Sequence, residues 1–322
     1  MISLVQKFKS VGILGINRRI GEYILPYNPR KNYPLVDDKW KTAELAESKS
    51  IPMPDHYGII EAFGDVQNLT SLISDKPGFV VKPANGGMGN GILVIDKILQ
   101  SDKGEFSFQK VDGKTLSKKN IMHHISGILS GLYSLDGNSD RAILQEKLLS
   151  HPFFNGIAYQ GIADIRVIVF LGYPVMAMLR LPTKDSGGRA NLHQGALGVG
   201  VDLLTGTLTS AVCDDKLIAK HPDTNETLAG RQIPFWQEIL TMSAKCFEVS
   251  GLGYLGVDIV LDERRGPLLL EMNARPGLGI QIANRMGLTE RLEKIERDGN
   301  PLESVSERIQ RMFGWLENKE IR

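Results

Sequence analysis

A row of three polar side chains follows directly on an apolar run in the C-terminal third of the chain. The stretch Leu268–Gly277 reads LLLEMNARPG, which places Glu271, Asn273 and Arg275 at alternate positions after three leucines. Because residues i and i+2 of a strand point to the same face of a sheet, a carboxylate, an amide and a guanidinium would stand side by side. Burying such a row costs free energy unless an ionic partner meets it. The spacing therefore predicts that a charged ligand binds here.

A further acceptor, Asp258, stands on the strand expected just before this row, in GVDIVLDERRG. Hard oxygen ligands from neighbouring strands suit Mg2+, which completes its octahedron with phosphate oxygens and water. We therefore predict Asp258, Glu271 and Asn273 as metal ligands, with Arg275 facing the same anion. One alternative is a solvated strand end, which would explain Asp258 but explains Glu271 poorly. Another is a salt bridge from Arg275 to Glu271.

A glycine-rich loop separates two expected strands in VVKPANGGMGNGILVI. Gly86, Gly87, Gly89 and Gly91 allow the backbone to approach a polyanion closely, and Lys82 on the first strand could reach a phosphate oxygen. The alternative is a flexible hairpin with an exposed lysine. The spacing matches neither the Walker pattern nor the dinucleotide-binding fingerprint, since no helix clearly follows.

Two further segments carry polar residues that could serve a site. ADIRVIVF places Asp164 and Arg166 on one face of a strand, and GGRANLHQG offers Arg189, Asn191 and His193 in a glycine-flanked loop. Taken singly, each segment fits an ordinary polar surface better than a site. Taken by itself, His193 is better explained as an ordinary loop histidine than as a general base.

Composition sets the broad class. Lys and Arg total 38 against 37 Asp and Glu, a net charge of +1, so no overall field favours a nucleic acid or an acidic membrane as partner. Two cysteines, Cys213 and Cys246, are too few for a disulfide framework or a structural zinc site, which predicts a cytoplasmic protein. No apolar run reaches the roughly 18 residues of a membrane helix.

The elements that must position these residues are short. Residues up to about Val36 are rich in Arg, Tyr, Pro and Asn without periodicity, which predicts an irregular arm. A helix is expected from Asp37, ending before Pro52, with an exit into a strand. Strands in GFVVKP, GILVID, EFSFQK and RAILQEKLL and a helix over 117–133 predict a small lobe with an antiparallel sheet.

The C-terminal part predicts a second lobe, so that the fold class is α+β. DIRVIVFLGYPVMAMLRLP reads as a hairpin, followed by a glycine-rich polar loop, a helix over about 234–250, two strands and a closing helix around 302–319. Two lobes with polar clusters at their edges predict a cleft between them. The expected division is an irregular Arg-rich arm at 1–36, a helical lead-in at 37–75, a central lobe with the glycine-rich lid loop at 76–148 and a C-terminal lobe with the metal ligands at 149–322.

In order, the segments DDKWKTAELAESKSIPMP, VVKPANGGMGNG, ILQEKL, DIRVIV, GGRANLHQG, GVDIVL and LLLEMNARPG span residues 37–279. This ordered set resembles the ATP-grasp carboxylate–amine ligases, specifically the RimK-type glutamate ligases and their alpha-L-glutamate ligase-like relatives. The resemblance implies an ATP-grasp fold with two α+β lobes gripping ATP between them. It also implies a truncated N-terminal segment in place of a full preceding domain.

The resemblance assigns roles residue by residue. Lys39 and Lys82 would contact the ATP phosphates, with the Gly86–Gly91 loop closing over them. Asp164 would hold the ribose, and Arg189 with Asn191 would reach the phosphates or an acyl phosphate. The adenine strand would comprise Gln145, Glu146, Lys147 and Leu148; the catalytic residues would be Arg166, Arg189, Asn191 and Arg275; the metal ligands would be Asp258, Glu271 and Asn273.

The implied activity is an ATP- and Mg2+-dependent ligase, with Mn2+ as a further metal, that forms an amide bond through an acyl phosphate. It would join L-glutamate or a similar amino acid to an amine of a peptide, a protein or a small molecule. The alternative is a non-catalytic ATP-binding sensor with the same fold. A third class, an NAD-binding oxidoreductase, is disfavoured because this sequence lacks the glycine fingerprint of that class. The sequence does not specify the amine acceptor or whether one amino acid or a chain of them is added. It is also compatible with a homo-oligomer.

Two departures from the family pattern bear on the substrate. Arg275 stands where many relatives have a small hydroxyl residue. Before Lys39 there is an arm in which Arg18, Arg19 and Arg30 cluster, where relatives carry a full domain. We hypothesise that these arginines replace part of that domain by binding a substrate carboxylate or an ATP phosphate.

Overall fold

The computed structural model describes residues 11–87, 89–100, 106–134, 137–214 and 216–321. The start of the predicted arm, residues 1–10, and Met88 of the predicted lid loop lie outside the described residues. The chain forms two compact units. The smaller unit comprises Asp38–Trp40 and Pro54–Leu148. The larger unit comprises the described residues up to Asp37, the segment Lys41–Met53 and the chain from Leu149 onward.

The smaller unit is built on an antiparallel sheet with the strand order β1-β6-β2-β3-β4-β5. Helix α7 (Lys118–Leu129) packs on this sheet through Ile121, Ile125 and Ile128, which recur at helical spacing and are fully buried. The predicted strands and helix of this lobe are thereby confirmed. The strands are β1 (His56–Ile60), β2 (Phe79–Pro83), β3 (Leu93–Gln100), β4 (Phe106–Lys110), β5 (Thr115–Ser117) and β6 (Ala142–Glu146), with α6 (Leu69–Ile73) beside β1.

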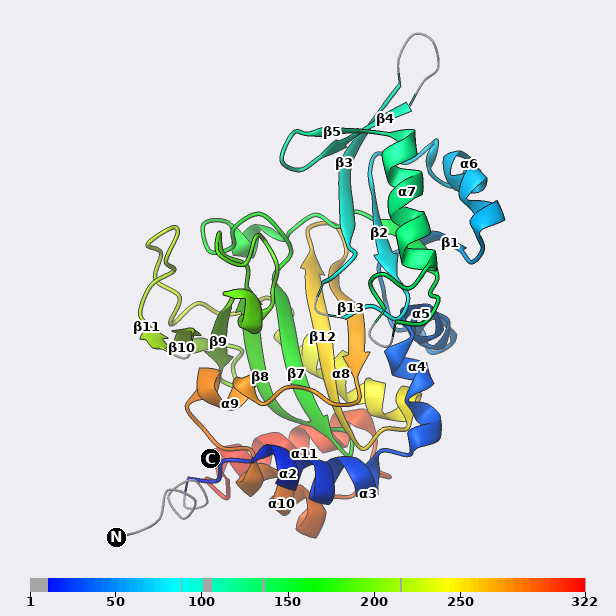
Figure 1. Cartoon of the computed structure of the whole chain (residues 1–322). Helices are drawn as coiled ribbons and strands as arrows, with labels where there is room; N and C mark the ends of the chain where they lie inside the picture. Colours follow the sequence, from blue (N-terminus) through cyan, green and yellow to red (C-terminus); the bar gives the residue numbers. More distant parts are fainter. Residues whose placement is uncertain (1–10, 88, 101–105, 135–136, 215, 322) are drawn as a thin grey trace. The chain divides into compact units, whose positions relative to one another are not determined.

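The larger unit contains a second antiparallel sheet, in the order β11-β10-β9-β8-β7-β12-β13. Helix α8 (Trp236–Ser250) packs on β7, β8, β12 and β13 and lies behind them in Figure 1. Helix α11 (Val305–Glu317) contacts α8 and β8. The strands are β7 (Asp164–Phe170), β8 (Tyr173–Leu181), β9 (Leu197–Val201), β10 (Leu208–Cys213), β11 (Lys216–Ile218), β12 (Tyr254–Asp262) and β13 (Gly266–Asn273). The α+β prediction is confirmed.

The segment after residue 10 is helical, where the sequence predicts an irregular arm. Tyr23 is fully buried against Phe170 at 5.4 Å between ring centroids, and the Asn28 amide donates to the Tyr254 and Ala274 carbonyls. These tertiary contacts select helical turns in a sequence without periodicity. The turns are α2 (Ile16–Arg18), the π-helical η1 (Arg19–Ile24), α3 (Leu25–Tyr27), the 3-10 turn η2 (Arg30–Asn32) and α4 (Pro34–Asp37), followed by α5 (Lys39–Ser48).

The arginines of this segment bind other parts of the larger unit. Arg18 donates to Glu293 at 2.7 Å and also pairs with Glu22. Arg19 donates to the Pro276 carbonyl at 2.5 Å. Figure 1 shows α2 beside α10 (Thr289–Asp298), where Glu293 lies. These contacts give Arg18 and Arg19 a structural role, and the ligand-binding role hypothesised for Arg18, Arg19 and Arg30 stays a prediction.

Strands β9 to β11 form where the sequence predicts a glycine-rich loop. Glycine weakens strand propensity, which hides the strand LGVGV in the sequence. The structure requires Gly200, because a Cβ there would lie 2.5 Å from the Ala283 carbonyl oxygen of α9 (Gly279–Asn284). Close packing of α9 on β9 is therefore the reason for the glycine.

Within the part of the chain that the structure describes, no helix combines the length and the apolar character needed to cross a bilayer.

Replacing Gly200 by Ala should lower the free energy of unfolding by about 1–3 kcal/mol, because α9 must move away from β9 to admit the Cβ. Chemical denaturation measures this. Gly314→Ala is the matched control, since a Cβ at Gly314 in helix α11 would meet nothing within 4 Å. Equal stability of the Gly200 variant and the wild type would contradict the packing argument.

Candidate active site

One face of the larger unit's sheet carries a charged row across four neighbouring strands. Asp164 of β7 pairs with Arg180 of β8, and Asp258 of β12 pairs with Arg166 of β7 on one side and Glu271 of β13 on the other. Because side chains alternate along strands, these pairs share one face. The other face packs on α8 in the core.

The charged side chains on this face are joined by hydrogen bonds. Arg166 donates from Nε and Nη2 to the two oxygens of Asp258 at 2.7 and 2.5 Å, a bidentate pair. Arg180 donates from Nη2 to Asp258 at 2.7 Å and from Nε to Asp164 at 2.5 Å. With Glu271 and Asn273, these four residues are called the Asp258 cluster.

The two buried aspartates differ in protonation because their arginine partners differ. Removal from water raises the pKa of Asp164 to about 7, since the attraction of Arg180 compensates for it only in part. Burial acts in the same direction on Asp258, but Arg166 and Arg180 together hold the pKa of that carboxyl well below its usual range. Asp258 is therefore ionised at neutral pH although its side chain is 0% exposed.

Glu271 and Asn273 reach the cluster through a β-bulge. Asp258 pairs with Glu271, but its neighbour Ile259 pairs with Leu269, so Leu270 is an extra residue in β13. The bulge turns Leu269 into the core and Glu271 to the opposite face, although the two residues are two apart. The Asn273 amide then donates to both Asp258 and Glu271 at 3.3 Å.

The donor set fits a hard cation. The Asn273 amide nitrogen lies 3.3 Å from a carboxylate oxygen of Asp258 and from one of Glu271, so two carboxylates and an amide meet at one point. The Asn273 amide can present its oxygen as well as its NH2 group. Asp258 already accepts from both arginines, which leaves Glu271 and Asn273 as the more accessible ligands. Among the described residues, no group of three or more His, Cys, Asp and Glu side chains could hold a metal, so this set depends on an amide.

Arg275 lies beyond the end of β13 and makes different contacts. Its Nη2 donates to Asp37 at 3.0 Å, and its guanidinium lies 5.0 Å from the centroid of the Tyr33 ring. The carboxylate paired with Arg275 is thus Asp37, where the sequence suggested Glu271. The cation–π contact keeps the guanidinium beside α4.

Among the predicted nucleotide-binding residues of the smaller unit, Lys82 lies on β2, and Gln145 and Glu146 lie on β6. Gln145 pairs with His56 of β1 and with Val80 of β2, which puts Lys82 on the same face as both. Lys82 and Gln145 are 5% and 4% exposed. Glu146 accepts from the Asp55 backbone at 2.7 Å, and Leu148 follows β6 half-buried.

Two lysines of the smaller unit are bound to neighbouring groups. Lys39 donates to the Gly86 carbonyl at 2.5 Å, which joins the start of α5 to the glycine-rich loop. Lys147 contacts the Asp96 carboxylate. In the same loop, Gly91 has φ +74°, and a Cβ there would lie 2.6 Å from the Tyr133 ring. The loop therefore depends on glycine for its path.

The residues of the polar loop in the larger unit separate into two groups. Asn191 accepts from the His193 backbone at 3.0 Å, and both residues line the same cavity as Arg166 and Arg180. Arg189 is exposed and does not line this cavity. The cavity has a volume of about 1030 Å³.

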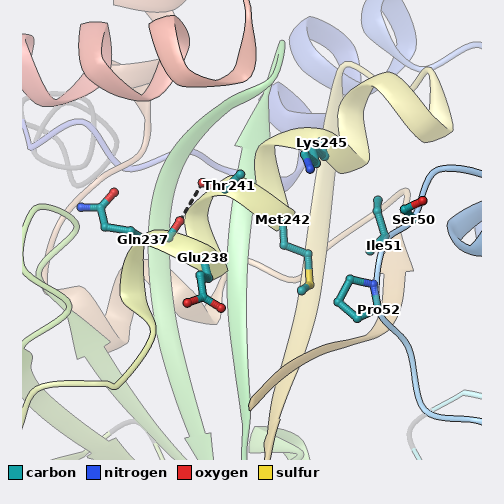
Figure 2. A pocket seen from close by; sticks show the side chains of 8 residues that line it. All are labelled: Ser50, Ile51, Pro52, Gln237, Glu238, Thr241, Met242 and Lys245. Atoms are coloured by element: carbon teal, nitrogen blue, oxygen red, sulfur yellow. Dashed lines mark hydrogen bonds between the residues drawn. The ribbon is translucent and has the colours of Figure 1, made fainter. Parts of the chain in front are cut away.

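A smaller cavity of about 290 Å³ lies between α8 and the segment Ser50–Pro52. Figure 2 shows Glu238, Met242 and Lys245 of α8 beside it. It contains none of the predicted site residues.

Two residues with positions fit for function were missed by sequence reasoning. Arg180 interrupts the apolar strand VMAMLRLP, the same signal that drew attention to Glu271. His56 has no comparable signal, since its place beside Gln145 follows from strand pairing. Desolvation, followed by the nearby Lys82 charge, lowers the pKa of His56 to about 4.

The sequence and the two sheets together define an ATP-grasp protein. Residues 18–297 match the family model described as sugar-transfer associated ATP-grasp, and the chain belongs to that family. The predicted membership of the ATP-grasp class is confirmed.

Relatives and structures extend the comparison. A Legionella pneumophila (strain Corby) protein named "Probable alpha-L-glutamate ligase" is 26% identical over 269 residues, 83% of this chain and 65% of that protein. One of the same name from Xanthomonas campestris pv. campestris (strain B100) is 27% identical over 263 residues, 80% of this chain and 64% of that protein. The chain thus spans less than two thirds of these curated relatives. Phosphoribosylamine–glycine ligase from Thermotoga maritima shares the fold, with a TM-score of 0.50 at 15% identity over 91% of this chain and 62% of that one.

Arg180→Met should lower the free energy of unfolding by about 3–5 kcal/mol, because it leaves buried Asp164 and Asp258 with less compensating charge. Arg231→Met is the matched control: Arg231 forms an exposed pair with Glu226, whose loss should cost at most about 1 kcal/mol. Urea denaturation compares the two variants. Similar losses in both would show that the buried network does not stabilise the fold.

The pKa of His56 predicts an acid-sensitive contribution to stability. Between pH 6.5, the ordinary value, and about 4, the unfolded chain binds a proton that the folded chain excludes, so stability falls as pH falls through this window. The loss should approach about 3 kcal/mol. His56→Phe should show a shallower decline than the wild type between pH 7 and 4 in denaturation experiments. Parallel curves would assign the decline to other groups.

Proposed function

We propose that this protein is an ATP-dependent carboxylate–amine ligase that forms an amide bond through an acyl phosphate. The observation that carries the proposal is the Asp258 cluster, in which Asp258, Glu271 and Asn273 meet beside the guanidiniums of Arg166 and Arg180. Membership of the ATP-grasp family and similarity to proteins named as glutamate ligases support it.

Each unit contributes a set of residues suited to a nucleotide. In the smaller unit, Lys82 and Lys39 would bind phosphate oxygens and the strand from Gln145 to Leu148 would bind adenine. In the larger unit, Asp164 would hold the ribose. Arg189 and Asn191 would reach the phosphates, and Arg275 would do so after leaving Asp37. The proposed functional division is the one expected from the sequence: the arm at 1–36, the lead-in at 37–75, the central lobe at 76–148 and the C-terminal lobe at 149–322.

Mg2+, when bound by Asp258, Glu271 and Asn273, would neutralise phosphate charge as a Lewis acid. The chain's own contribution is charge and orientation. A substrate carboxylate oxygen attacks the γ-phosphorus of ATP, the bond from that phosphorus to ADP breaks, and an acyl phosphate forms. Arg166 and Arg180 would lower the repulsion between the two anions. Their fixed pairing with Asp258 holds both guanidiniums in place before the substrates bind.

The second half of the reaction requires an amine. The amine nitrogen attacks the acyl carbon, the bond to phosphate breaks, and a proton leaves the nitrogen. His193, which lines the same cavity as Arg166, is the candidate proton acceptor. We propose L-glutamate or a similar amino acid as a substrate from the names of the relatives. The amine would belong to a peptide, a protein or a small molecule.

Glu271→Gln should reduce ADP release by at least about 100-fold, because it removes a negative charge where cation and phosphate meet. The assay follows ADP with ATP and Mg2+ over a panel of carboxylates and amines, with mass spectrometry of the products. Glu238→Gln, an exposed change on α8, is the matched control and should retain activity. ATP binding with no turnover on any pair would favour the sensor over the ligase.

A further inference from the structure

The larger cavity has mainly apolar walls. They come from the segment after residue 10, strand β8, the loop at 191–196, β10 and β11, and the region around α9. Its volume of about 1030 Å³ is at the upper end for small-molecule sites, and a single glutamate would fill only a small part of it.

Several of these wall residues expose large apolar side chains to solvent. Ile16 is 62% exposed, Leu217 57% and Ile282 45%, and they belong to α2, β11 and α9. Single exposed apolar residues need no explanation, but here three distant segments bring theirs to one cavity. Such a wall gains free energy when an apolar body covers it.

Three guanidiniums and one carboxylate are among the ionisable side chains that line the cavity. Arg166 and Arg180 line it, each with a side chain 12% exposed, and Arg285 lines it as well, against one carboxylate, Asp214. Each guanidinium has five N–H donors, and the described bonds to Asp164 and Asp258 engage Nε and Nη2 of Arg166 and Arg180. The N–H groups of Arg166 and Arg180 that these bonds leave, together with Arg285, can donate to an anion.

We infer that this cavity binds a carboxylic acid with an apolar body, with its carboxylate toward Arg166 and Arg180 and its hydrocarbon or aromatic part along Leu217 and Ile282. The inference rests on the proposed ligase function and differs from it in one point, since it replaces glutamate by an amphipathic acid as the carboxylate substrate. Glutamate fits this site poorly, because its ammonium and second carboxylate would lie against apolar walls. An amphipathic acid places one charge at the arginines and buries the rest.

The test measures binding by calorimetry to the full chain without ATP. Ligands are butyrate, hexanoate, octanoate, 3-phenylpropionate and glutamate, with octylamine as the chain of opposite charge. Affinity should rise by up to about fourfold per added methylene. Octanoate should bind at least about tenfold more tightly than glutamate or octylamine.

The variants Ile282→Glu and Leu217→Glu each place a carboxylate on a wall and should weaken octanoate binding at least about tenfold. Both positions are exposed, so the fold should tolerate them. Leu302→Glu is the matched control, since Leu302 is 92% exposed and does not line the cavity. Equal octanoate affinity in all three variants would overturn the inference.

The ADP-release assay separates this inference from the proposed function. Octanoate binding that depends on Ile282 and Leu217, without ADP release for any amine, would support the cavity assignment and refute the ligase. ADP release and product formation with glutamate as the carboxylate, unchanged in Ile282→Glu, would support the ligase and overturn the cavity assignment.

Discussion

The buried carboxylate of Asp258 is the constraint on which the larger unit depends. It is shielded from water and stays charged because Arg166 and Arg180 donate to it in fixed geometry. Such a group is tolerated only where neighbouring strands hold its partners rigidly. The central strands β8, β7 and β12 meet that need, since their opposite face is anchored to α8 in the main core. Packing on one face thus permits charge on the other.

The same network gives its members different chemical properties. Asp258 and Asp164 lie on adjacent strands and share Arg180, yet the pKa of the first is held below its usual range and the pKa of the second is raised. The difference arises because Arg166 donates two hydrogen bonds to Asp258, whereas the hydrogen bond described for Asp164 comes from Arg180. Placing a third carboxylate, Glu271, across from Asp258 leaves the cluster more acidic than its two arginines can balance. An added cation would relieve that excess.

The apolar cavity and the charged row meet at Arg166, Arg180 and Met178. Met178 and Arg180 are two apart on β8, so one face of that strand carries both an apolar and a cationic contact. The segment after residue 10 supplies part of the apolar wall, and Arg18 and Arg19 tie it to α10 and to the Pro276 carbonyl. Those arginines therefore shape the cavity indirectly, by holding its wall in place.

The sequence by itself determined the α+β class of the fold and identified Asp258, Glu271 and Asn273 as one set, because charged residues within apolar strands are conspicuous at short range. It also determined the strands and helix of the smaller unit through alternation and helical spacing. Tertiary structure decided what depends on distant segments: the helical turns fixed by Tyr23 and Asn28, the strand at Gly200, and the partner of Arg275. The bulge at Leu270 belongs to the same group, since strand pairing alone turns Leu269 inward and Glu271 outward. Local patterns report which side chains need a partner, whereas only the folded chain determines which partner comes within reach.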